Sequence, residues 1–288
     1  MTGIDPRMKK YLGILFSILF IFGCERPKGF TLKKITSYYE PSDQWEIAHT
    51  LSDETLLRIL DQPYIYLGSG NHTYAFESFD GKFVIKFFKQ KHMKIQTPFL
   101  SKEKIEKRKN EREESFSSYM IAYRHLKEET GLLFLHLNKT NHLGISLKLI
   151  DQHGKSMEIN LDDMEFLIQK RAVLAFDHLG TLIDQGTYGD ALIGIRSLLS
   201  VVAKRNQMGI YDKDLQFFKN FGFINNQAVE VDIGEFKMGI DVPNTYEELL
   251  RLSYQISEFI SEKAPGLVSV VENEMNEVTS QYKLKDSS

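Results

Sequence analysis

The sequence has a single cysteine, Cys24, among its 288 residues. One cysteine excludes an intrachain disulfide and a zinc site built from cysteines. The chain also lacks an excess of basic residues, because 36 Lys and Arg stand against 39 Asp and Glu, a formal net charge of -3. This balance gives no electrostatic footprint for nucleic acid, so we expect no nucleic-acid partner. A Gly-Lys-Ser/Thr phosphate loop is absent as well.

Near the N-terminus, the apolar run is too short for a typical membrane span. Residues 11 to 24 are uncharged and mostly apolar, and they follow Lys9 and Lys10. As a helix these 14 residues extend about 21 Å, against about 30 Å for a bilayer core. The pattern therefore favours the apolar region of a secretory signal over a membrane anchor.

The end of this run, Gly23-Cys24, resembles a bacterial lipoprotein signal, in which the cysteine becomes the acylated first residue. The resemblance implies lipidation at Cys24, export, and association with the membrane through the N-terminal segment. An uncleaved anchor with the domain facing the cytoplasm is the alternative, and a buried helix is a third interpretation. We assign residues 1–28 to this signal or anchor and 29–59 to an N-terminal extension.

After the extension, the pattern predicts three strands in succession. "YIYLGSG" and "TYAFESF" are separated by a short glycine-containing turn, and the Asp80-Gly81 turn leads into "FVIKFF". A helix is expected before them at "SDETLLRIL", with Ser52 as its N-cap. Residues 101 to 128 then predict a charged helix with one apolar face.

Further strands are expected up to about residue 170, and the pattern is mostly helical beyond it. The sequence therefore predicts an α+β chain with two lobes. The first, 60–172, has an antiparallel sheet and one helix, and the second, 173–280, is reduced and mostly helical. Residues 281–288 are expected to form a disordered tail.

Several residues in the first lobe suit the binding of phosphate. Glycines let the backbone approach phosphate groups closely, and Gly68-Ser69-Gly70 lies between two predicted strands. Lys86 follows on the next strand within an apolar run, where it can reach the phosphates. Such a lysine needs a carboxylate to hold it, and the charged helix offers Glu113 or Glu114.

The second lobe offers the oxygen ligands that phosphoryl transfer requires. Asp214 and Asn220 lie in "DKDLQFFKN" after a long predicted helix, and Asp232 ends a strand in "VDIG". Magnesium prefers oxygen ligands, and a carboxylate can orient the attacking hydroxyl. Each residue alone is also common in turns. Their order in the chain, with the glycines and Lys86 before them, is the stronger signal.

This order resembles the protein-kinase-like superfamily, and the resemblance covers residues 60 to 238. It implies a kinase-like fold, ATP and Mg²⁺ as cofactors, and a phosphotransferase activity of the small bacterial or small-molecule type, with an unknown acceptor. The implied roles are Asp214 as catalytic base, Asn220 and Asp232 as metal ligands, and Lys86, held by Glu113 or Glu114, on the phosphates. The nucleotide would also contact Gly68, Ser69, Gly70 and Thr73, with Gln169 and Arg171 in the hinge that binds adenine.

The chain departs from the family's pattern in four places. Thr73 replaces the third glycine, Asp212 stands where the family has histidine, the catalytic loop has one extra residue before Asn220, and no Ala-Pro-Glu follows Asp232. These departures leave a second hypothesis open, a membrane-anchored, kinase-shaped binding protein without turnover. His136 and His142 have no third ligand nearby, so we expect both to be structural.

Overall fold

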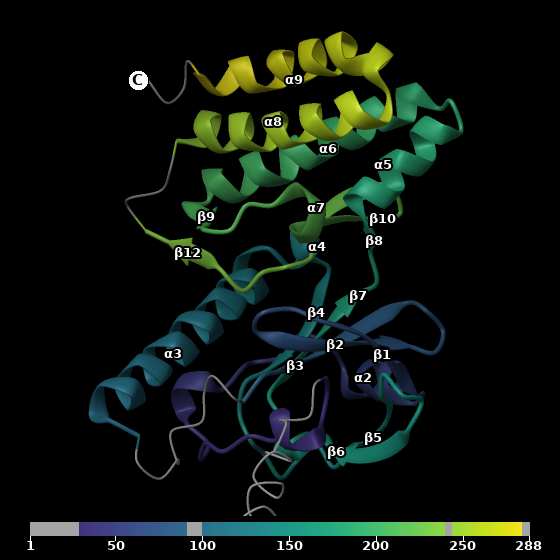
Figure 1. Cartoon of the computed structure of the whole chain (residues 1–288). Coiled ribbons are helices and arrows are strands. Elements are labelled where there is room, and N and C mark those ends of the chain that lie inside the picture. Colours follow the sequence, from purple (N-terminus) through teal and green to yellow (C-terminus); the bar gives the residue numbers. More distant parts are fainter. Residues whose placement is uncertain (1–28, 91–99, 240–243, 284–288) are drawn as a thin grey trace, which may run out of the picture.

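The computed structural model describes residues 29–90, 100–239 and 244–283 (Figure 1). The predicted signal and Cys24 lie outside these ranges, so lipidation and export stay predictions. Within the described ranges, no helix is both long enough and apolar enough to cross a bilayer.

A seven-stranded sheet forms the first half of the chain, in the order β4-β7-β3-β2-β1-β5-β6. Neighbouring strands are antiparallel except for β1 and β5, which run parallel. The predicted turn between β2 and β3 is present, with Gly81 at a φ of 70°, a conformation that glycine adopts without strain. The strands are β1 (Tyr64–Ser69), β2 (Thr73–Ser78), β3 (Phe83–Phe88), β4 (Leu132–His136), β5 (Ser146–Ile150), β6 (Ser156–Asn160) and β7 (Phe166–Lys170).

Two further elements of this half agree with the sequence pattern. Helix α2 (Asp53–Leu60) begins after Ser52, whose side chain accepts a hydrogen bond from the Thr55 N–H. Helix α3 (Lys102–His125) packs its apolar face beside the sheet, and the short α4 (Lys127–Thr130) follows it. Figure 1 shows α3 beside the region where the sheet meets the helical half.

The N-terminal extension is part of the same core. Phe30 packs edge to face on Phe76 of β2, with ring centroids 4.9 Å apart. Trp45 is buried and meets Phe116 of α3 at 5.2 Å. The extension therefore contacts both the sheet and α3. It contains the 3₁₀ turns η1 (Leu32–Lys34) and η2 (Asp43–Trp45), and η3 (Leu161–Asp163) precedes β7.

The second half is mostly helical and has its own apolar core. Its helices are α5 (Ala175–Asp184), α6 (Tyr188–Gln207), α7 (Phe217–Asn220), α8 (Thr245–Lys263) and α9 (Val268–Lys283), with the turn η4 (Pro265–Leu267). Two small antiparallel sheets pair β8 (Val173–Leu174), β10 (Phe221–Ile224) and β11 (Gln227–Glu230), and β9 (Ile210–Asp212) with β12 (Phe236–Met238).

The mixed α+β architecture predicted from the sequence is thus present, and it is compatible with a kinase-like fold. One boundary differs. Residues 281 to 283 were expected in a disordered tail but continue α9. Tyr282 packs against the same apolar core as Val271 and Met275, which holds this last turn of the helix in place. The remainder of the predicted tail lies outside the described residues.

Candidate active site

The glycine-containing turn between β1 and β2 leaves open space above its backbone. Nothing lies within 4 Å of the point where a Cβ would stand at Gly68 or at Gly70. The turn closes through a hydrogen bond from the Gly70 N–H to the Thr73 carbonyl, 3.1 Å long. Ser69 ends β1, and Thr73 begins β2 with its side chain buried. Thr73, at the position of the third glycine in the family's pattern, is therefore the first residue of β2.

Lys86 lies in the middle of β3 and points toward the helical half. Its Nζ donates to the carbonyl of Val231 at 2.6 Å. Burial lowers the pKa of the Lys86 ammonium, and the neighbouring Asp232 carboxylate opposes that shift. The structure therefore brings Lys86 together with the predicted metal ligand Asp232.

Neither predicted helix carboxylate meets Lys86. Glu114 pairs with Lys237 of β12 at 3.3 Å, and its side chain is 61% exposed. Glu113 is exposed on the same turn of α3. The face of α3 that meets the site instead carries Ser118 and Tyr119, both buried.

A short loop after β9 holds the next group of predicted residues. Buried Asp212 accepts a hydrogen bond from the Asp214 N–H at 3.0 Å. The Asn220 amide donates to the Asp212 carboxylate at 3.4 Å and also to the Asp214 carbonyl. Asp214 is exposed, and its carboxylate accepts from Gln216. The buried Asp212 carboxylate thus holds the loop through the Asp214 N–H and the Asn220 amide, while the Asp214 carboxylate lies at the surface.

Val231 joins this loop to the sheet. Its N–H donates to the Asn220 carbonyl at 2.6 Å, while its carbonyl accepts from Lys86. The next residue is Asp232, whose carboxylate is exposed and accepts weakly from the Gly234 N–H at 3.4 Å. One residue, Val231, therefore bonds to both Lys86 and Asn220 and directly precedes Asp232.

A buried charge cluster supports the loop, and the sequence did not point to it. Arg205 of α6 is fully buried between Glu230 of β11, at 3.1 Å, and Glu248 of α8, at 2.8 Å. Burial raises the pKa of Glu230 to about 8 and that of Asp212 to about 6. One guanidinium cannot balance several buried carboxylates, and the raised pKa keeps Glu230 protonated at neutral pH.

The backbone N–H groups at the predicted hinge donate hydrogen bonds within the protein. The N–H groups of Lys170 and Arg171 donate to the carbonyls of Gly131 and Lys82, both at 2.8 Å. The Gln169 side chain donates to the Thr130 carbonyl at 2.9 Å, and Arg171 pairs with Glu77 at 2.7 Å. These two N–H groups are therefore already bonded, and an adenine ring would have to meet the chain after Arg171.

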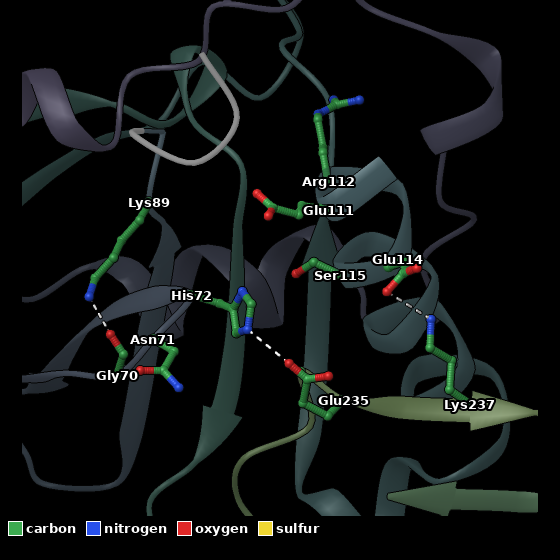
Figure 2. A pocket seen from close by; sticks show the side chains of 11 residues that line it. Gly70, Asn71, His72, Lys89, Glu111, Arg112, Glu114, Ser115, Glu235 and Lys237 are labelled. Atoms are coloured by element: carbon green, nitrogen blue, oxygen red, sulfur yellow. Dashed lines mark hydrogen bonds and ion pairs between the residues drawn. The ribbon is translucent and has the colours of Figure 1, made fainter. Parts of the chain in front are cut away.

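A pocket of about 530 Å³ opens beside the site, between the β1–β2 turn, α3 and the residues that follow Asp232. Figure 2 shows His72 reaching across it to Glu235, with His72 Nε2 and Glu235 Oε1 3.1 Å apart. The tip of the turn thus contacts the segment after Asp232. Lys86, Asp214, Asn220 and Asp232 do not line this pocket.

The residues present fit a magnesium–nucleotide complex in chemical terms. The open space over Gly68 and Gly70 suits phosphate, and Lys86 supplies a cation nearby. Asparagine coordinates a metal through its amide oxygen, and the Asn220 nitrogen is already engaged by Asp212 and Asp214. Among the described residues, no cluster of three His, Cys, Asp or Glu side chains forms a metal site. A kinase-like magnesium site needs none, since Asp, Asn and phosphate oxygens share the coordination.

His136 lies in the core, as its structural interpretation expects. It is 5% exposed and packs on Phe166 with ring centroids 5.1 Å apart. Burial, with a smaller contribution from His49, lowers the pKa of His136 to about 4, while Asp162 acts against the shift. His142 adds a further small lowering.

This histidine predicts that acid weakens the fold. Below pH 6.5 the unfolded chain protonates His136 but the folded chain does not until about pH 4, so unfolding takes up a proton. We expect this residue to remove at most ~3 kcal/mol from the free energy of unfolding between these values. Urea denaturation at a series of pH values measures it, and His136→Phe should flatten that part of the profile. An unchanged slope in the variant would assign the acid sensitivity to other groups.

Comparisons with known proteins assign no family to this chain. No protein family and no curated protein matches the sequence. Many solved structures are similar, among them three of WbdD, one described as a bifunctional kinase-methyltransferase and another as a complex with a kinase inhibitor. These three are 12–13% identical with TM-scores of 0.36–0.37, covering 73–75% of this chain and 43–46% of WbdD. The chain spans less than half of WbdD, and similarity of this size assigns neither family nor activity.

Proposed function

We propose that the chain is an ATP- and Mg²⁺-dependent phosphotransferase with a kinase-like site. The observation that carries the proposal is the pair of backbone bonds of Val231, whose carbonyl accepts from Lys86 and whose N–H donates to the Asn220 carbonyl, immediately before Asp232. Residues from β3, the β9–α7 loop and the segment after β11 thus meet at one point.

The roles follow from the chemistry of the groups. Asp232 and Asn220 would hold magnesium, which neutralises charge on the transferred phosphate. Lys86 would contact the phosphates, and the exposed Asp214 carboxylate would orient the acceptor hydroxyl. Catalysis would rest on positioning and charge neutralisation, and the acceptor is not identified.

One observation favours the alternative, a nucleotide-binding protein without turnover. Lys86 has no carboxylate partner on α3, and its ammonium is held by a backbone carbonyl instead. Such a lysine is free of the ion pair that active protein kinases require. Binding without transfer would then be the function, at the membrane if the N-terminal prediction holds.

Asp214→Asn separates the two candidates. The change keeps the side-chain oxygen that accepts from Gln216 but removes the charge. For the phosphotransferase we expect γ-phosphate release or transfer to fall about 10²-fold or more, with Mg²⁺-ATP affinity preserved. Asp177→Asn, an exposed change in the first turn of α5, is the control and should keep full activity. Wild-type protein that binds Mg²⁺-ATP without turnover would support the binding protein.

A further inference from the structure

Helix α3 is tied to the segment after Asp232 by one buried hydroxyl group. The Ser118 Oγ donates to the Ile233 carbonyl at 2.6 Å and accepts from the Phe236 N–H at 2.7 Å. Ser118 is 1% exposed. Its two bonds bracket the turn that contains Gly234 and Glu235, so this backbone cannot move without breaking them.

The same segment is packed on α3 by its side chains. Ile233 and Phe236 are buried in one apolar cluster with Tyr119 of α3. The Tyr119 hydroxyl lies 3.4 Å from the point where a Cβ at Gly234 would stand, and Asp232 Oδ1 lies 3.6 Å from that point. The carboxylate of Asp232 is therefore adjacent to the α3 face that Ser118 anchors.

These contacts occupy the place where a helix carboxylate was expected. The acidic side chains Glu113 and Glu114 are exposed, and Lys86 does not reach them. We propose that Ser118 is a positioning residue: it clamps residues 233 to 236 to α3 and so fixes the Asp232 carboxylate for the metal. The proposal rests on the proposed function, because it assumes that Asp232 binds magnesium.

The chain offers a closely matched control one turn earlier on α3. Ser115 is 3% exposed, and among the described residues its hydroxyl has no hydrogen-bond partner. Figure 2 shows this hydroxyl pointing into the pocket beside the site. Ser118→Ala and Ser115→Ala thus remove the same atom from the same buried helix face, but only the first removes the clamp.

Two measurements on the full-length chain in detergent test the proposal. In Ser118→Ala we expect the dissociation constant for ATP with Mg²⁺ to rise about 10-fold, while ATP affinity in EDTA is unchanged. Amide exchange across residues 233 to 238 should become faster. Ser115→Ala should match wild type in both. A general loss of stability would weaken ATP binding with and without the metal.

The outcomes are distinguishable. Equal Mg²⁺-ATP affinity in Ser118→Ala and wild type would overturn the positioning role. Weaker binding in both serine variants would overturn it as well. If the wild type binds no Mg²⁺-ATP, the proposed function fails and the positioning role fails with it, even though faster exchange in Ser118→Ala would still show the clamp.

Discussion

Arg205→Met is expected to lower the free energy of unfolding by about 3–5 kcal/mol, because it leaves buried Glu248 without its cation. Urea denaturation at neutral pH measures the change. The Arg205 charge also favours the ionised form of Asp212, which accepts the hydrogen bond from the Asp214 N–H. The loop that carries Asp214 should therefore become more mobile as well.

The control for this change lies on the same helix. Arg196 pairs with Glu274, but its side chain is 56% exposed. An exposed pair contributes little, so Arg196→Met should cost less than about 1 kcal/mol. Similar losses in the two variants would contradict the role given to the buried cluster. Glu230→Gln should be tolerated, because the protonated carboxyl of Glu230 is neutral like the amide.

Lys86→Met is expected to lower phosphate transfer about 10²-fold or more and to weaken ATP binding. The change removes the cation that would face the phosphates in the proposed site, and loss of one such donor typically has an effect of this size. The fold should survive, since Met keeps most of the side-chain volume and the losses are the bond to the Val231 carbonyl and the attraction to exposed Asp232.

Lys82→Met tests the specificity of that result. Lys82 directly precedes β3, the strand that carries Lys86, and its side chain is 73% exposed. It should retain wild-type binding and transfer. Full activity in Lys86→Met would show that the ammonium group has no part in the reaction.

Much of the sheet was predictable because its signals are local. The Asp80-Gly81 turn and the alternating apolar residues around it define the hairpin that carries Lys86. The order of Lys86, Asp214, Asn220 and Asp232 along the chain indicated residues that the structure brings together around Val231.

The partners of α3 could not be inferred in the same way. A carboxylate was expected for Lys86, and Glu113 and Glu114 are the acidic residues that the charged helix offers for it. The buried face of the helix is set by packing, and it places Arg112 inward, where it pairs with buried Glu165 at 3.7 Å. Glu113, one residue further, is therefore turned outward.

The buried cluster illustrates a second limit. Arg205, Glu230 and Glu248 come from α6, β11 and α8, and nothing in their local sequences marks them as buried. Charged residues are ordinarily assigned to the surface. Only the tertiary fold brings them together. The same holds for the packing of Trp45 against Phe116 of α3.

Whether Asp232 binds a metal–nucleotide complex is tested most directly by measuring ATP affinity with and without Mg²⁺. For wild-type chain we predict binding that Mg²⁺ strengthens, and for Asp232→Ala we predict that this strengthening is lost. Asp232 is exposed, so the variant should fold normally. Wild-type protein that binds no ATP, or an Asp232→Ala protein that retains the full Mg²⁺ effect, would show that Asp232 does not bind a metal–nucleotide complex.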